Sequence, residues 1–169
     1  MAILPVMTFP SEVLRKACSE AEPGTVEIRE LADNMIETMY AAPGIGLAAP
    51  QVGWSIRMVV VDVTAILGEP EPHILLNPGI VSSEEVIAFE EGCLSLPELS
   101  VEIDRARKIE VHFQDLDGDR KSLEAEDLLA VAIQHEIDHL EGKLILDYAS
   151  MVRRDLYRRK ARKMRAQGI

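Results

Sequence analysis

The segment AEDLLAVAIQHEIDHL, residues 125–140, predicts the helix around which the rest of this chain folds. Five apolar residues recur in it at helical spacing and form one broad face: Leu128, Leu129, Ala132, Ile133 and Ile137. Gly142 follows just beyond the segment, where a glycine commonly ends a helix. We therefore predict a buried helix whose apolar face packs against the other elements.

Inside this helix, His135 and His139 flank Glu136 in a His-Glu-Xaa-Xaa-His pattern. Residues four apart lie on one helix face, so both imidazoles can reach a single metal ion. Glu136 leaves the helix about 100° from His135, which places it beside such an ion, where a general base belongs. The alternative is a surface helix with this spacing by chance. It is disfavoured because two unpaired imidazoles would be costly beside an apolar face.

Two histidines leave a metal ion short of protein ligands, because catalytic zinc-like sites use three and keep one position for water. Candidates for the third ligand are the downstream carboxylates Glu141 and Asp147, or Cys93. Gly92 precedes this cysteine and permits a close backbone approach. Free cysteines are, however, most often small buried hydrophobes, and the residues alone favour that interpretation of Cys93.

A third segment of interest is the tight apolar stretch Gly44–Gln51. It does not match the dinucleotide-binding fingerprint, because no strand precedes it. It is either an ordinary turn between a helix and a strand, or a loop that lines a cleft. In the second case, the Gln51 amide would donate a hydrogen bond to a substrate oxygen.

The remaining pattern predicts an α+β fold. A short helix is expected over residues 11–18, an amphipathic helix over 26–39 and a C-terminal helix over 151–166. Strands are expected over residues 57–63, 74–78, 85–89, 108–114 and 120–124, with a hairpin turn at Asp117-Gly118. Strands without strict βα alternation favour antiparallel sheets packed around the central metal-binding helix, in one domain over residues 1–169.

Composition and length limit the possible classes of protein. A chain of 169 residues fits one domain, and 4% aromatic residues imply an aliphatic core. Two cysteines are too few for a disulfide framework. No stretch approaches the ~20 apolar residues that span a bilayer, and Met1–Pro10 lacks the basic start of a signal peptide. We expect a cytoplasmic protein without a membrane partner.

Charge is distributed unevenly along the chain. Residues 1–150 carry a net charge of −18, whereas residues 151–169 contain eight basic residues and one acid. The body should repel nucleic acid, and the tail could attract it. Two interpretations of the tail stand equal: a solvated helix packed on the body, or a helix that docks on the ribosome near the nascent-chain exit.

Three segments together resemble the signature motifs of the peptide deformylase family: Gly44–Gln51, Glu91–Ser95 and Gln134–Leu140. They occur in the family's order and at about its spacing. The opening Ile3-Leu4 and residues 142–148 are also similar, so the resemblance covers about residues 3–165. Three motifs in register are far more specific than any one of them.

The resemblance implies removal of the N-formyl group from the initiator methionine of new polypeptides, with release of formate. It implies one divalent metal ion on Cys93, His135 and His139. Ferrous iron is the family's usual metal, and Zn2+, Ni2+ or Co2+ can substitute; ligand softness alone would suggest zinc. Glu136 would move the proton, while the Gln51 side chain and the Leu94 backbone N–H would stabilise the tetrahedral oxyanion.

The resemblance also implies a pocket for the methionine side chain and contacts to the peptide backbone. The expected pocket residues are Ile45, Phe89, Leu128, Val131 and Ala132. Gly46 and Glu98 would pair with the peptide as an added strand does. Glu91 and Arg105 would form an ion pair behind Cys93. Many relatives have a basic residue or glycine where this chain has Leu99-Ser100, which puts substrate contacts near Ser100 in doubt.

Two rival functions remain compatible with parts of the pattern. A zinc peptidase of the His-Glu-Xaa-Xaa-His type would take its third ligand from a downstream histidine or glutamate, and Cys93 argues against it. A ribosome-binding protein without activity would not need the set formed by Gln51, Cys93 and Glu136.

Overall fold

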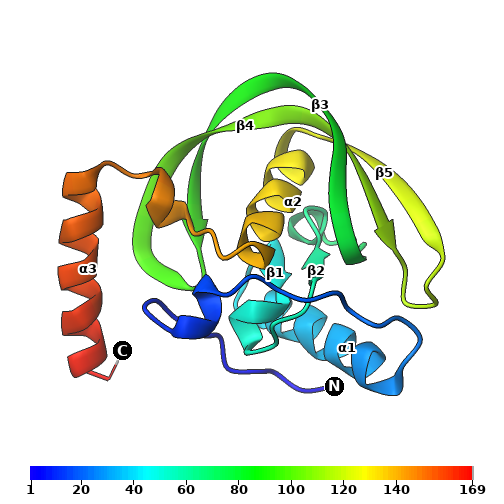
Figure 1. Cartoon of the computed structure of the whole chain (residues 1–169), viewed down its shortest axis with the longest axis horizontal. Helices are drawn as coiled ribbons and strands as arrows, with labels where there is room; N and C mark the ends of the chain where they lie inside the picture. Colours follow the sequence, from blue (N-terminus) through cyan, green and yellow to red (C-terminus); the bar gives the residue numbers. More distant parts are fainter. Residues whose placement is uncertain (169) are drawn as a thin grey trace.

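The computed structural model describes residues 1–168 and has an α+β architecture (Figure 1). Its helices are α1 (Val26–Ala41), α2 (Asp127–Leu140) and α3 (Met151–Ala166). Its strands are β1 (Gly46–Ala48), β2 (Met58–Val61), β3 (His73–Cys93), β4 (Leu96–Gln114) and β5 (Arg120–Glu126). Four short 3-10 helices complete it: η1 (Glu12–Arg15), η2 (Ala49–Val52), η3 (Ala65–Leu67) and η4 (Ile145–Tyr148).

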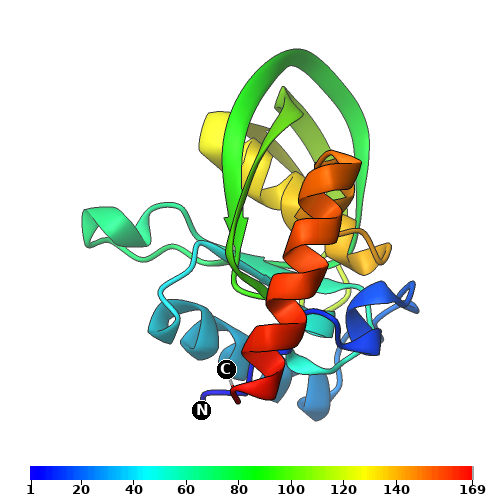
Figure 2. The ribbon, with the colours of Figure 1, turned by 90° about the vertical axis from the view of Figure 1, so that its left-hand side faces the viewer.

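The described strands form one antiparallel sheet in the order β1-β2-β3-β4-β5, so spatial neighbours are also neighbours in sequence. β3 and β4 make a long hairpin, from Leu76 opposite Gln114 to Cys93 opposite Leu96. Three register shifts interrupt this pairing, the last of them next to Cys93. Such irregularities bend strands. The hairpin accordingly arches over α2, as Figures 1 and 2 show from two directions.

The short strand β2 is buried on both faces because helices lie on both sides of it. Side chains alternate between the faces of a strand. Val59 and Val61 therefore pack in the cluster that contains α2, whereas Met58 and Val60 pack in the cluster that contains α1. This explains why the run Met58–Val61 is continuously apolar and fully buried rather than alternating.

Helix α2 begins and ends at positions set by its neighbours. Ala125 pairs with Ile109 of β4, so the helix starts two residues later than the sequence predicts, at Asp127. Gly142 ends it in the left-handed region, at φ 74°, and a Cβ there would lie 2.6 Å from the Arg15 carbonyl oxygen. Only glycine fits so close to that backbone. The apolar face of α2 packs on the concave side of the sheet.

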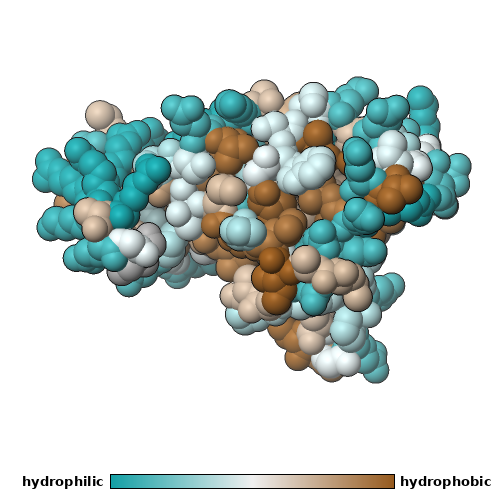
Figure 3. All heavy atoms as spheres, turned by 90° about the horizontal axis from the view of Figure 1, so that it is seen from below, coloured by the Kyte–Doolittle hydropathy of each residue, from teal (hydrophilic) through white to brown (hydrophobic). Residues whose placement is uncertain are grey.

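Helix α3 packs on the β3–β4 hairpin with a narrow face. Tyr157 and Ala161 are its buried residues, and the Tyr157 hydroxyl donates to the Pro97 carbonyl at 2.9 Å. The rest of the helix is mostly exposed, and the α3 end of the molecule is mostly hydrophilic in Figure 3. Within residues 1–168, none of the helices is long and apolar enough to cross a membrane.

Several predicted elements have different bounds in the structure. The strands predicted over residues 74–78 and 85–89 are parts of the single strand β3, and the strand predicted over residues 108–114 is only the last part of the 19-residue strand β4. The first of these predicted strands ends at Pro78, a residue that lacks a backbone N–H, but a register shift between Leu76 and Gly79 lets the strand continue. The short helix predicted over residues 11–18 is one 3-10 turn, Glu12–Arg15.

Candidate metal centre

The thiol of Cys93 and the imidazoles of His135 and His139 converge at one point. The His139 Nε2 atom lies 3.3 Å from the Cys93 Sγ atom and 3.3 Å from the His135 Nε2 atom. All three potential ligand atoms lie within 4.8 Å of one another. The structure therefore brings together the two helical histidines and the one distant cysteine.

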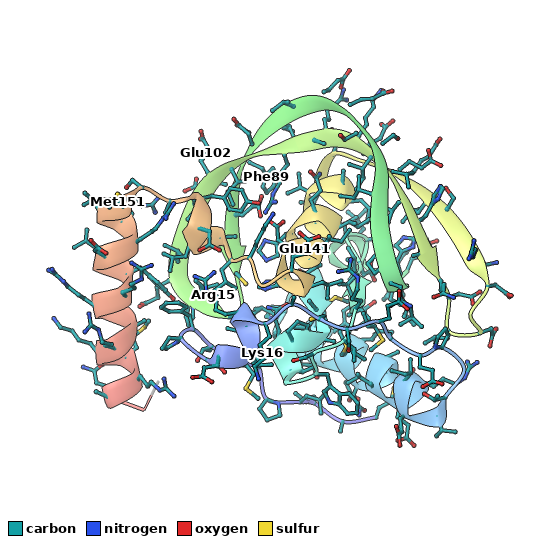
Figure 4. All side chains as sticks on the ribbon, in the orientation of Figure 1. Arg15, Lys16, Phe89, Glu102, Glu141 and Met151 are labelled. Atoms are coloured by element: carbon teal, nitrogen blue, oxygen red, sulfur yellow. The ribbon has the colours of Figure 1, made fainter. Side chains whose placement is uncertain are left out.

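Secondary structure explains how these residues meet. His135 and His139 lie one turn apart on α2, and Cys93 is the last residue of β3, where the hairpin turns over that helix. The carboxylates considered as alternative ligands lie elsewhere. Asp147 forms an ion pair with Arg15, and Glu141 is exposed at the end of α2 (Figure 4).

The donor set fits a divalent transition metal. Metal–nitrogen bonds of about 2.0 Å at tetrahedral angles place two ligand nitrogens about 3.3 Å apart, which is the separation of the two Nε2 atoms. One thiolate and two imidazoles suit zinc, iron, nickel or cobalt, and they leave a fourth position for water or substrate.

Without a cation, these groups compete for protons. Burial opposes charging of the His135 ring, but contacts with Cys93 and Glu91 raise the pKa of His135 well above its ordinary value. Burial and the neighbouring His135 lower the pKa of His139 well below its ordinary value. Since metal ligands must be deprotonated, a cation would displace the proton from His135.

A buried ion pair supports His135 from behind. The Nδ1 atom of His135 lies 2.8 Å from a carboxylate oxygen of Glu91, and both oxygens of Glu91 accept from the Arg105 guanidinium at 2.8 and 2.9 Å. Burial opposes ionisation of Glu91, but hydrogen bonds from His135 and Arg105 lower its pKa below the usual range. Such a contact fixes the ring orientation and directs Nε2 toward the other candidate ligand on the helix, His139.

Glu136 is buried beside the cluster, with 4% of its surface exposed. Its Oε2 atom has no hydrogen-bond partner among the described residues. Burial raises the pKa of Glu136 to about 7. A cation nearby would lower this pKa, because positive charge stabilises a carboxylate. A carboxylate with an unsatisfied oxygen, next to a metal site, is well placed to accept a proton.

Gly46 of β1 lies against Glu136 so closely that a side chain would displace the carboxylate. A Cβ at Gly46 would lie 2.6 Å from the Glu136 Oε1 atom and 3.0 Å from its carboxyl carbon. Gly46→Ala is therefore expected to lower kcat at least tenfold. Displacing the carboxylate would raise the activation free energy of proton transfer, and a rise of about 1.4 kcal/mol slows a reaction tenfold. Gly79→Ala is the matched control, because its Cβ would meet nothing within 4 Å. Equal kcat values for the two variants would contradict the role given to this contact.

The side chain of Gln51 is buried and held in one orientation. Its Oε1 atom accepts from the Ala48 backbone N–H at 2.9 Å, so its amide nitrogen must face the other way. That nitrogen donates to the Ser95 hydroxyl at 3.1 Å and lies 3.7 Å from the Cys93 Sγ atom. Leu94 follows Cys93 in the turn, and its N–H makes no backbone hydrogen bond within residues 1–168. Two donors thus lie next to the candidate metal ligands.

A mostly apolar cleft of about 440 Å³ opens over this centre. It is lined by Cys93, His135 and Glu136 together with all seven residues that the resemblance assigned to substrate: Ile45, Gly46, Phe89, Glu98, Leu128, Val131 and Ala132. Figure 4 labels Phe89 on the left arm of the hairpin. Leu96 and Leu99 also line the cleft and were missed. Leu99 begins an alternation of buried and exposed residues in β4, which would have indicated a buried face but not which cavity that face lines, and Leu96 lies outside this alternation.

An α+β fold that gathers a thiol, two imidazoles and a buried carboxylate at the floor of an apolar cleft defines a metal-dependent hydrolase. A sequence model of the polypeptide deformylase family matches residues 3–155. The peptide deformylase of Rhizobium meliloti is 48% identical over 157 residues, which cover 92% of this chain and 90% of that protein. The chain belongs to the peptide deformylase family.

Solved structures agree with this assignment. A peptide deformylase from Legionella pneumophila superimposes with a TM-score of 0.91 at 40% identity, over 99% of this chain and 98% of that one. The peptide deformylase of Ehrlichia chaffeensis, solved in complex with actinonin, also gives 0.91, at 38% identity over 97% and 98% of the two chains. The family consists of metal-dependent enzymes that remove the N-formyl group from nascent peptides.

Proposed function

We propose that this chain acts as one catalytic domain that removes the formyl group from N-terminal formylmethionine, using a divalent metal ion on Cys93, His135 and His139. The observation that carries the proposal is the convergence of these three ligands beside Glu136, beneath the apolar cleft. A helical pair of histidines alone would serve many metalloenzymes. The added thiol and the deformylase-like cleft favour this reaction.

Ferrous iron is the metal we propose in the cell, with zinc, nickel or cobalt able to occupy the same ligands. The mixed sulfur and nitrogen donors suit each of these ions, so the preference for iron rests on the family resemblance. When bound, the cation supplies Lewis-acid chemistry: it lowers the pKa of water and polarises a carbonyl group.

Glu136 moves the proton in this mechanism. A water oxygen forms a bond to the formyl carbon, and the Glu136 carboxylate accepts the proton that this oxygen gives up. The same carboxyl group then delivers the proton to the methionine nitrogen as the carbon–nitrogen bond breaks, which yields formate and a free amine. The support is its burial and its unsatisfied oxygen, which leave it free to accept.

Gln51 and Leu94 are proposed to stabilise the negative charge that develops on the formyl oxygen. The Gln51 amide nitrogen already lies next to Cys93, and the Leu94 N–H follows directly in the turn. Donors that are held in place before the reaction cost no reorganisation when charge develops. The bond from Ala48 to Gln51 supports this role, because it keeps the donor end of the amide pointed at the site.

The substrate is proposed to lie in the cleft with its methionine side chain among Ile45, Phe89, Leu128, Val131 and Ala132. These residues form an apolar wall that suits a thioether chain. Gly46 and Glu98 are proposed to contact the peptide backbone. The complex of the Ehrlichia chaffeensis relative with actinonin shows that a member of this fold binds that compound, and we propose that actinonin binds here in the same cleft.

The reaction is tested by comparing formyl-Met-Ala-Ser, acetyl-Met-Ala-Ser and unblocked Met-Ala-Ser as substrates of the metal-loaded protein. We expect stoichiometric formate from the first peptide alone, with no cleavage between residues of any of them. Cleavage of the unblocked peptide would instead establish a peptidase. Absence of formate from a protein with a full complement of metal would overturn the proposal.

We also propose that the enzyme works in the cytoplasm and that basic helix α3 docks on the ribosome. The support is the concentration of exposed basic residues on α3. Docking through phosphates predicts co-sedimentation with ribosomes that weakens as salt rises. Replacing the exposed Arg159 and Arg162 by glutamate should abolish co-sedimentation while deformylation of a short peptide continues. Unchanged co-sedimentation of this variant at low salt would exclude the docking.

A further inference from the structure

A continuous series of polar contacts leads from the metal-facing His135 to the surface on the side of α2 away from the substrate. Beyond the pair of Glu91 and Arg105, the Arg105 Nη1 atom donates to an oxygen of Asp138 at 2.7 Å. The hydroxyl of Tyr148 donates to this same Asp138 oxygen, also at 2.7 Å. Arg105 also meets Tyr148 directly: its Nη1 atom donates to the Tyr148 hydroxyl at 3.4 Å, and its guanidinium lies 5.0 Å from the centre of the Tyr148 ring.

Burial makes these contacts interdependent. The side chains of Glu91, Arg105 and Asp138 are 4%, 5% and 16% exposed. Charges in such surroundings are weakly screened, so each one responds to its neighbours. Arg105 contacts two carboxylates with one planar group, so a shift of Asp138 must alter how Arg105 meets Glu91.

Tyr148 is the outermost member of this network. It belongs to η4, just beyond α2, and it lines a second cavity of about 410 Å³ together with Arg57, Asp104 and Arg105. This cavity lies on the other side of the network from the substrate cleft, with which it shares no lining residue. The Tyr148 hydroxyl therefore does not reach the substrate, and its contacts serve the network alone.

We propose that Tyr148 is a positioning residue for the metal centre. Its hydroxyl fixes Asp138 and accepts from Arg105, Asp138 holds the same edge of the Arg105 guanidinium, and Arg105 holds the Glu91 carboxylate against His135. This inference rests on the proposed metal ligands. It assigns to a surface tyrosine, three contacts away through Arg105 and four through Asp138, part of the restraint that keeps His135 aligned with the other two ligands.

The test uses Tyr148→Phe, which removes the hydroxyl and keeps the ring over Arg105. Tyr40→Phe is the matched control, because the Tyr40 hydroxyl also donates to an aspartate, Asp62, but outside this network. Each protein is loaded with cobalt(II), and the rate of cobalt transfer to a chelator is measured together with the visible spectrum. Loss of an outer contact to a metal ligand typically costs about 10–100-fold in affinity or activity.

We expect Tyr148→Phe to release cobalt about tenfold faster, at the lower end of that range, and to shift the cobalt absorption bands. Tyr40→Phe should behave as the wild type in both measurements. The double variant Tyr148→Phe/Asp138→Asn should release cobalt more slowly than the combined single effects predict, since the hydroxyl and Asp138 hold the same edge of Arg105. Wild-type release by Tyr148→Phe, or additive effects in the double variant, would overturn this inference. Failure of the wild type to bind cobalt would overturn the metal site itself.

Discussion

Glu136→Gln is expected to reduce kcat for a formylated peptide by about 10²–10⁴-fold, the usual contribution of a positioned general base. Glutamine keeps the size and most of the polarity of the side chain but cannot take up the proton. The cation should still bind, because Glu136 is not among the three converging ligands. The measurement is steady-state formate release, with metal content determined on the same preparation.

Glu141→Gln is the matched control for this experiment. Glu141 follows the last residue of α2, and it is exposed and outside the cleft. Its replacement makes the same chemical change near the same helix and should leave kcat at the wild-type value. Near-normal turnover by Glu136→Gln, with metal bound, would remove Glu136 from the proton-transfer step and direct attention to another base.

Cys93→Ala is expected to empty the metal site and to abolish activity with it. Removing the thiolate leaves two imidazoles, and two ligands are fewer than catalytic sites of this kind use. We expect metal affinity to fall by more than about 100-fold, the upper end of what loss of an outer contact costs. Metal content after dialysis, measured by elemental analysis, gives the result directly.

Cys18→Ala provides the control for Cys93→Ala. Cys18 is the other free cysteine, it is partly buried, and it packs in the cluster of the α2 side rather than at the site. This variant should keep both metal and activity. Retention of a full equivalent of metal by Cys93→Ala would show that the sulfur is not a ligand.

The sequence predicts elements that depend on local periodicity better than those that depend on pairing. The helix over residues 151–166 has the predicted bounds. The helix predicted over residues 26–39 begins where predicted and ends two residues later, at Ala41. The long strand β3 was predicted as two pieces, residues 74–78 and 85–89, and the residues between them show no alternation of apolar and polar side chains. Whether a strand continues through such residues depends on its partner, β4, and no local rule contains that information.

The candidate site shows the same division. The helical spacing of His135 and His139 predicts a shared ion from the residues alone. Cys93 was one of three candidates for the third ligand, and only the family resemblance favoured it, because His135 lies 42 positions further along the chain and only the arch of the hairpin joins them. The contact of Gly46 with Glu136 and the reach of Tyr148 to Asp138 depend on tertiary packing, and only the coordinates revealed them.

The most direct test is X-ray absorption spectroscopy of the protein purified without oxygen, combined with elemental analysis. Our account predicts one divalent metal per chain, coordinated by one sulfur atom, two imidazole nitrogens and one oxygen atom from water. A stoichiometric metal with no sulfur in its coordination shell, or a protein that retains no metal while it releases formate, would contradict it.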